Sequence, residues 1–414
     1  MATKKCSSNS STSISRISAA RFIIFTLKAI GLWQWTADSS QLANSRLSYL
    51  FKLQRAHGLI LHVPISFTYI TLMFTAVLLS QELEEISSVL HVLLTEFALV
   101  VKILHIWRLR NASWRYMDEL ANEPMYAFRR QSERAKWQRA QRSFAIIAYT
   151  YILGSLAVVV FGCIGVMLTP ADVYILPFNF YIPFEWRHPR KYWYAWTYSS
   201  ICMLLTCISN VSLDMIFCYF MFHLSLLYKL IGWRLTALRR PKSTKGRVRD
   251  GGGEDESEVI DQMAEIFQMH MKLKRLTTKC EALVSVPVLA QIVLSAFILC
   301  FSGYRLQHMD NMENVGILIS TIQFASVMIL QIFLPCHYGD AVNEYSNALT
   351  NDIFNSDWTT FDVPSRKFMI LYMELLKRPA NLKAANFFKI GLPVFAKTMN
   401  NAYSIFALLL NMNK

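Results

Sequence analysis

The histidines and cysteines are the residues of this sequence that could hold a metal or act as catalytic groups. His57 and His62 lie five residues apart, on poorly matched faces of a helix, and the neighbours Cys336 and His337 lack the second close ligand pair that a zinc site needs. Three further histidines are isolated in the sequence: His91, His105 and His223. The sequence also contains no phosphate-binding loop of the form GxxxxGKS or GxxxxGKT. We therefore expect no catalytic residue, no bound metal, no cofactor and no enzymatic activity.

The composition indicates that these side chains are held in a membrane. Of the 414 residues, 54% are hydrophobic and only 17% are charged, against about 25% charged in soluble domains. The apolar residues gather into runs of about 20, the length that crosses a hydrocarbon layer about 30 Å thick. The net charge of +14 could suggest nucleic acid, but no folded soluble module with clustered phosphate-binding residues is present. We expect a polytopic membrane protein with no nucleic-acid partner.

Seven apolar runs predict the transmembrane segments, and their length without alternating polarity favours helices over a barrel. They cover residues 57–79, 86–107, 144–168, 197–228, 283–304, 315–338 and 390–410. The predicted fold is all-α with seven transmembrane helices, the fourth continuing beyond the bilayer. Residues 1–56 would form an N-terminal segment with an interfacial helix, 57–338 the first six spans with a ligand pocket, 339–389 an anchor and assembly region, and 390–414 the last span with a short tail.

Basic residues in the connecting segments predict the orientation of the chain. Lys and Arg number eight before the first span, nine between the second and third, and twelve between the fourth and fifth, whereas the other three short connections carry four in all. Basic connections stay on the cytoplasmic side. The N-terminus should therefore be cytoplasmic and, with seven spans, the C-terminus extracellular.

Polar side chains inside the spans are costly and often mark function. Glu96 and Asp214 lie in the second and fourth spans, and Lys102 is not on the same helix face as Glu96. In the last span Lys397, Asn401 and Ser404 are spaced as i, i+4 and i+7 and so form one polar stripe. The spacing alone leaves two interpretations open: the stripe lines an aqueous pore, or it hydrogen-bonds to neighbouring helices.

Several segments resemble the insect odorant receptor family. The strongest match begins at residues 331–340, which read QIFLPCHYGD, and continues through IFNSDW at 353–358 to AYSIF at 402–406. The GLW at 31–33 resembles the N-terminal motif of the family, and LPF at 176–178 with PFE at 183–185 resembles its second outer loop. The resemblance covers most of the chain. It departs at His337, where many members have a cysteine or another small residue.

The resemblance implies a subunit of an odorant-gated, non-selective cation channel in the plasma membrane of olfactory sensory neuron dendrites. Members of the family assemble as tetramers with a shared odorant co-receptor subunit and bind small volatile ligands, and their last helices line one central pore for permeating cations. The implied pore and gate residues are Lys397, Asn401, Ser404, Phe406, Leu409 and Leu410. The implied ligand pocket lies between the second, third, fourth and sixth spans, with these candidate lining residues: His91, Thr95, Tyr151, Ser155, Met203, Cys207, Asn210, Gln323 and Ser326.

Three alternative functions are considered beside this one. A gustatory-type receptor channel of the same superfamily would follow its Thr-Tyr motif with a Gln-Phe pair, whereas here Ala402-Tyr403 is followed by Leu408, Leu409 and Leu410. A G-protein-coupled chemoreceptor needs an extracellular N-terminus, and neither Asp-Arg-Tyr after the third span nor Asn-Pro-x-x-Tyr in the last occurs. A transporter or lipid enzyme would show internal repeats or catalytic clusters.

Overall fold

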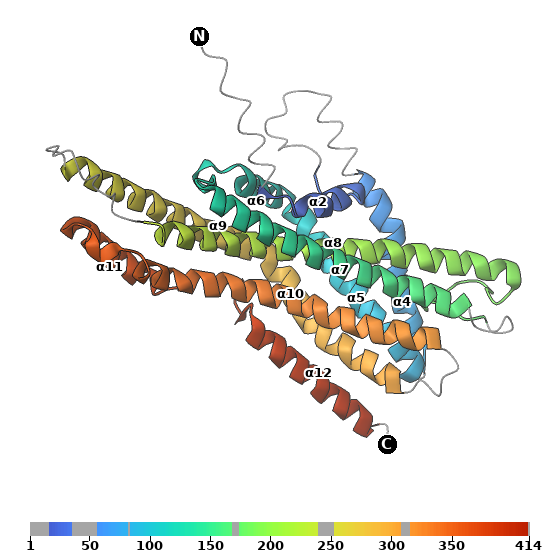
Figure 1. The fold of residues 1–414 in the computed structure, drawn as a ribbon. Coiled ribbons are helices and arrows are strands. Elements are labelled where there is room, and N and C mark those ends of the chain that lie inside the picture. The colour runs from blue at the N-terminus through green and yellow to red at the C-terminus, as the bar shows by residue number, and fades with distance from the viewer. Residues whose placement is uncertain are drawn as a thin grey trace, which may run out of the picture.

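The computed structural model describes residues 16–34, 56–81, 83–167, 174–238, 252–307 and 315–412. The described residues form an elongated bundle of helices (Figure 1). Their only strands are β1 (Lys383–Ala384) and β2 (Phe388–Lys389), which pair antiparallel in a small hairpin. The prediction of an all-α membrane fold is confirmed.

Six described helical segments are long and apolar enough to cross a membrane. The first, Ala56–Leu79, contains the π-helix η2 (Val63–Phe67) and α4 (Thr68–Leu79). The others are parts of α5 (Leu83–Arg108), α7 (Gln131–Met167), α8 (Pro189–Leu235), α9 (Gly252–Gln307) and α10 (Val315–Phe354). They coincide with the first six predicted runs. The seventh run forms α12 (Leu392–Met412), which is less apolar because it carries Lys397, Asn400 and Asn401.

Four of these helices continue well beyond the apolar runs. Helix α8 has 47 residues, which confirms that the fourth run continues as a longer helix, and α7, α9 and α10 have 37, 56 and 40. Hydropathy identifies only the apolar part of such helices. The polar extensions follow the helical pattern without being apolar enough to mark a membrane segment.

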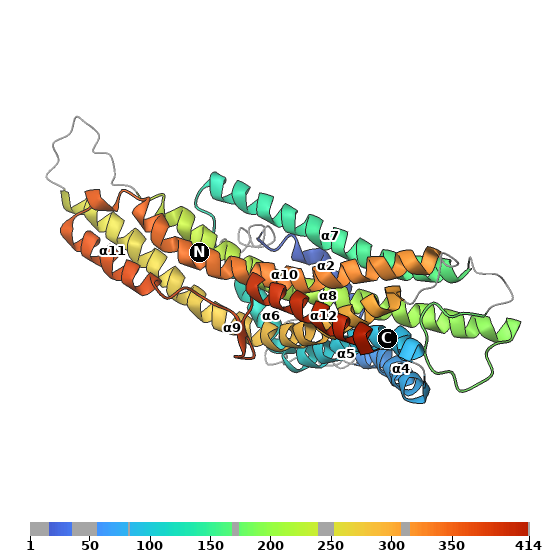
Figure 2. The same ribbon diagram turned by 90° about the horizontal axis from the view of Figure 1, so that it is seen from below.

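The extensions of α9 and α10 run together with α11 (Val363–Leu376) at one end of the molecule (Figures 1 and 2). Between α10 and α11 lies the short 3-10 helix η4 (Trp358–Thr360). Near the N-terminus, α2 (Ala20–Ala29) packs on α8, and the connection from α5 to α7 contains α6 (Arg110–Asn122) and the 3-10 helix η3 (Pro124–Tyr126). The expected N-terminal helix is therefore present as α2.

Helix α8 forms the axis of the bundle, because it packs against α7, α9 and α10. Its residues 213–221 are buried without interruption, so the helix is enclosed on all sides rather than amphipathic. Helix α12 lies at the periphery, alongside α9 and α10 (Figure 1). These two arrangements position the two candidate functional regions, a cavity beside α8 and an open face on α12.

Candidate functional site

A small cavity lies where α5, α7, α8 and α10 meet, and we call it the inner cavity. Its free volume is about 40 Å³. Most of its wall is apolar, with a few hydroxyl, thiol, amide and carboxyl groups. The lining residues are Thr95, Glu96, Tyr151, Ser155, Val158, Val159, Met203, Thr206, Cys207, Asn210, Val211, Phe324, Val327 and Met328.

Helical spacing explains how four helices bring these side chains together. Residues three or four positions apart share a helix face, and Tyr151, Ser155 and Val158 follow this spacing on α7. The lining residues of α8 and α10 follow the same rule, from Met203 to Asn210 and from Phe324 to Met328. Each helix therefore contributes one narrow stripe to a shared wall.

Six of the nine predicted pocket residues line the inner cavity: Thr95, Tyr151, Ser155, Met203, Cys207 and Asn210. The other three lie elsewhere. His91 lines a neighbouring cavity, and Gln323 is half-buried and donates from Nε2 to the carbonyl oxygen of Gly154 at 3.0 Å. Ser326 is exposed, with its hydroxyl bonded to the Ile322 carbonyl at 2.9 Å, and lies away from the cavity wall.

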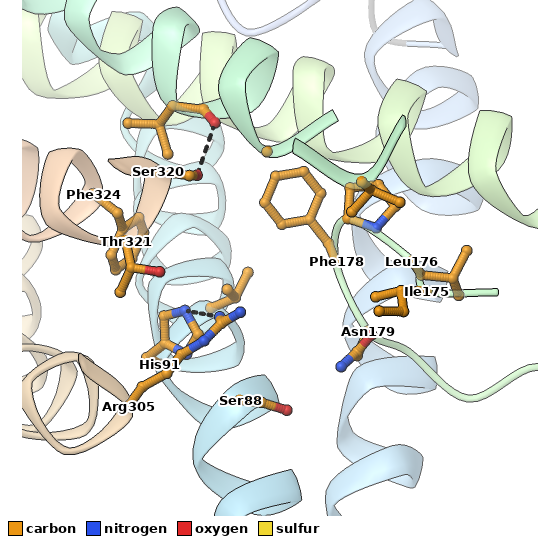
Figure 3. A pocket seen from close by; sticks show the side chains of 15 residues that line it. Ser88, His91, Ile175, Leu176, Phe178, Asn179, Arg305, Ser320, Thr321 and Phe324 are labelled. Carbon is orange, nitrogen blue, oxygen red and sulfur yellow. Dashed lines mark hydrogen bonds between the residues drawn. The ribbon is translucent and has the colours of Figure 1, made fainter. Parts of the chain in front are cut away.

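The neighbouring cavity, which we call the outer cavity, has a free volume of about 70 Å³ and is more polar (Figure 3). His91 and Arg305 lie side by side in its wall, and Arg305 Nη1 donates to His91 Nε2 at 3.3 Å. Phe178 reaches it from the segment that joins α7 to α8. Phe324 and Val158 line both cavities, so these two side chains form the partition between them.

A buried ion pair connects the inner cavity to its surroundings. Lys102 Nζ lies 2.6 Å from Asp214 Oδ1, and the Lys102 side chain is 1% exposed. The same ammonium group donates to Asn210 Oδ1 at 2.8 Å, while Asp214 Oδ2 accepts from Gln331 Nε2 at 2.6 Å and from the Tyr151 hydroxyl at 3.5 Å. The charges of Lys102 on α5 and Asp214 on α8 therefore neutralise each other. Tyr151 and Asn210 belong to both the cavity wall and this network.

Sequence reasoning missed several lining residues on α10. Phe324, Val327 and Met328 form the apolar wall opposite α7 and α8. Their types and spacing are those of ordinary core residues, so no local signal separates them from packing positions. The one weak signal for this face of α10 is Gln331, three residues after Met328. A polar side chain on a buried face needs a partner, which here is Asp214.

Helix α12 exposes the predicted polar stripe. Lys397, Asn401 and Ser404 are all exposed in the single chain. Phe406 is half-buried, and its ring packs on α9 at Gly303, where an added Cβ would lie 3.2 Å from Phe406 Cδ2. Leu409 is half-buried, and the side chain of Leu410 lies outside the described residues.

Helix α10 also contacts α12 beyond the cavity. The rings of Phe333 and Phe395 meet edge to face with centroids 5.5 Å apart. Closer to the hairpin, Gly339 lies so near Ile390 that a Cβ there would be 2.6 Å from Ile390 Cγ2. One helix thus bears the cavity wall, the Gln331 bond to Asp214 and the contact with α12.

The described residues contain no cluster of three or more His, Cys, Asp or Glu side chains that could hold a metal. Of the charged groups in the site, Lys102 and Asp214 are already paired. The wall of the inner cavity offers apolar contact and a few hydrogen-bonding groups, the combination common in small-molecule sites.

Comparison with known proteins identifies the family. A sequence profile described as 7tm Odorant receptor matches residues 82–403. Odorant receptor 94a of Drosophila melanogaster is 46% identical over 398 residues, covering 96% of this chain and 98% of that protein. Odorant receptor 2a of the same species is 25% identical, covering 66% and 67%.

The fold matches as well. The structure of the insect olfactory receptor OR5 from Machilis hrabei in complex with eugenol superposes with a TM-score of 0.78 at 14% sequence identity, covering 97% of this chain and 99% of that one. The odorant resemblance found in the motifs is therefore confirmed, and these families are receptors rather than enzymes. This chain is a multi-pass membrane protein that belongs to the 7tm odorant receptor family.

Proposed function

We propose that this chain is the ligand-tuning subunit of an odorant-gated channel. A small volatile molecule binds in the inner cavity and, together with a shared odorant co-receptor subunit in a heterotetramer, opens a non-selective cation pore. The observation that carries this proposal is the continuity of α10, which lines the cavity through Phe324 and Met328, bonds Asp214 through Gln331 and contacts α12 through Phe333.

The size of the cavity supports a coupling between binding and helix movement. Its free volume of about 40 Å³ is well below the roughly 150 Å³ of a cavity that binds benzene. A volatile molecule therefore has to displace part of the wall. Met203 and Met328 can yield most easily because methionine is unbranched and flexible. The remaining displacement falls on the helices that carry the wall, including α10.

The energies required are modest. A ligand that moves a closed-to-open equilibrium from 1:99 to even odds needs about 2.7 kcal/mol of preferential binding to the open form. A micromolar affinity corresponds to about 8 kcal/mol, within reach of a ligand of about ten heavy atoms at 0.3 to 1.5 kcal/mol per atom. Apolar contact with one or two hydrogen bonds is sufficient.

The exposed face of α12 supports the pore assignment. Lys397, Asn401 and Ser404 face away from the chain's own bundle, and polar groups within a membrane need a partner or water. Four last helices around one axis, contributed by this chain and its co-receptor, would enclose an aqueous path for permeating cations. Near its end, Phe406, Leu409 and Leu410 would form an apolar constriction that closes by dewetting and opens when the helices separate.

The proposal includes the orientation and location of the chain. The N-terminus is cytoplasmic and the C-terminus extracellular, as the basic connections predict, and the protein resides in the plasma membrane of sensory dendrites. Antibody access to N-terminal and C-terminal tags in unpermeabilised cells tests the orientation. Staining of the N-terminal tag without permeabilisation would overturn it.

Voltage clamp of cells that express this chain with the odorant co-receptor tests the ligand site. A panel of esters, alcohols, ketones and aromatics should include agonists, and Tyr151→Phe or Asn210→Ala should change their ranking because both residues line the cavity. Ser326→Ala is the matched control, because Ser326 is exposed on α10. An unchanged ranking in both cavity variants would contradict the proposed binding site.

A further inference from the structure

The inner cavity contains one acidic side chain that its surroundings leave incompletely paired. Glu96 is 3% exposed, and its Oε2 atom has no hydrogen-bond partner among the described residues. Lys102, six residues further along α5, is held by Asp214 and Asn210. A buried polar atom without a partner keeps its desolvation cost, so a donor that reaches it binds favourably.

The cavity wall supplies no hydroxyl or thiol hydrogen to this atom. Each such group has another acceptor within hydrogen-bond distance. Thr95 bonds the His91 carbonyl at 3.0 Å, Ser155 the Tyr151 carbonyl at 2.8 Å, Thr206 the Met203 carbonyl at 3.2 Å, Cys207 the Ser155 carbonyl at 3.6 Å and Tyr151 the Asp214 carboxylate at 3.5 Å. Thr206 also reaches the Glu96 carboxyl, but the Oε2 atom itself has no hydrogen-bond partner among the described residues.

The amide NH2 group of Asn210 is a donor in the wall that lacks an acceptor in the described part of the chain. The Asn210 side chain accepts from Lys102 through Oδ1, and its Nδ2 group has no recorded acceptor among the described residues. The same cavity therefore offers a free acceptor on α5 and a free donor on α8. A hydroxyl group can serve both, because it has one hydrogen to donate and lone pairs to accept.

We propose that the preferred ligands of this receptor carry a hydroxyl group, as alcohols or phenols, and that Glu96 Oε2 receives its hydrogen. Ethers, esters and ketones of the same size fit the apolar wall but leave Glu96 unpaired. This inference rests on the proposed ligand site and adds the chemical class of the ligand. The selectivity arises from the mismatch between donors and acceptors in the wall rather than from the shape of the cavity.

Isomeric ligand pairs separate hydrogen bonding from size. Para-cresol and anisole have the same atoms, and so do hexanol and dipropyl ether, but only the first of each pair has a hydrogen to donate. Dissociation constants are measured by thermal stabilisation of the purified complex of this chain with its co-receptor, and currents are recorded with the same ligands. We expect the hydroxyl member to bind about tenfold more tightly than its isomer, which corresponds to about 1.4 kcal/mol.

Three variants assign this preference. Glu96→Met removes the acceptor at similar length and should bring the ratio of the two dissociation constants to about one. Glu96→Gln keeps a carbonyl oxygen and should retain the preference. Ser326→Ala is the matched control and should keep the preference, because Ser326 is exposed on α10 and is not part of the cavity wall. A ratio of two constants on one purified protein does not depend on expression level.

Equal binding of both isomers to the wild type, or a preference that survives in Glu96→Met, would overturn the inference. Failure of every hydroxyl compound in the panel to bind would overturn it as well. A hydroxyl preference in binding without any odorant-evoked current would leave the role of Glu96 standing and contradict the proposed channel function instead. Odorant-evoked currents of equal size for both isomers would contradict the role of Glu96 and leave the proposed channel function standing.

Discussion

Neutralising Asp214 alone should destabilise the receptor severely. Its carboxylate is the only recorded counter-charge of Lys102 among the described residues, and the Lys102 side chain is 1% exposed. Removing one partner of a buried pair costs about 3–5 kcal/mol, because the other charge stays buried and unpaired. Since whole domains are stable by only about 5–15 kcal/mol, Asp214→Asn should lose most of its folded, surface-expressed protein.

A second substitution should restore the protein. Lys102→Met combined with Asp214→Asn removes both charges and keeps a side-chain oxygen for Gln331. Replacing a buried pair by neutral groups of similar size is often close to neutral. Surface biotinylation and the melting temperature of detergent-purified protein measure the effect. Lys377→Met is the control, because Lys377 and Glu374 form a pair that is 68% and 67% exposed and such pairs contribute little.

Equal expression and melting temperature for Asp214→Asn and Lys377→Met would refute this account of the ion pair. So would a double variant that is no better than Asp214→Asn, because the cost would then arise from lost packing or from the hydrogen bonds of Asp214 rather than from the unpaired ammonium group of Lys102. The comparison of the single and double variants therefore separates the cost of an unpaired buried charge from the cost of lost packing or hydrogen bonds.

Three further predictions concern the cavity, the packing of α7 on α10 and the pore. Val159→Trp fills the inner cavity and should abolish odorant-evoked current at normal surface expression. Ser326→Trp, on the exposed face of α10, should keep the current. Equal currents in the two variants would contradict the inner cavity as the ligand site. Gly316→Ala should lower the melting temperature, at a cost of about 1–3 kcal/mol, because its Cβ would lie 2.6 Å from Gly165 Cα. Gly154→Ala is the control and should leave the melting temperature unchanged, because a Cβ there meets nothing within 4 Å. Equal shifts in both variants would contradict the close packing of α7 on α10. Lys397→Glu should raise calcium permeability relative to sodium in reversal-potential measurements, because an acidic ring attracts divalent cations; an unchanged ratio would place Lys397 outside the pore.

The positions of the membrane helices could be predicted well because hydrophobicity fixes them. The run 86–107 became the span Glu85–Arg108 almost unchanged. The polar start of α7 at Gln131 could not be found in this way. Its stability comes from packing, for example of Trp137, which is fully buried and donates from Nε1 to the Arg16 carbonyl at 3.1 Å. Such contacts join residues 121 positions apart, and no local pattern reveals them.

The candidate site could be predicted in part. Helix spacing placed Tyr151 with Ser155 and Met203 with Cys207, but the choice of those faces came from the family resemblance. The sequence shows that Glu96, Lys102 and Asp214 lie within spans and need partners. It does not show which residues are those partners, because helix spacing cannot show which residues on other helices lie nearby. The structure pairs Lys102 with Asp214 on another helix and leaves one oxygen of Glu96 open.

Outside-out patches from cells that express this chain with its co-receptor test the central claim most directly. Patches held in nucleotide-free solution lack the guanine nucleotides that G-protein signalling needs. If a ligand in the inner cavity opens the pore itself, rapid application of an agonist should evoke cation current within milliseconds, and Val159→Trp should remove that current. A current that disappears in nucleotide-free patches, or that persists in Val159→Trp, would contradict the account.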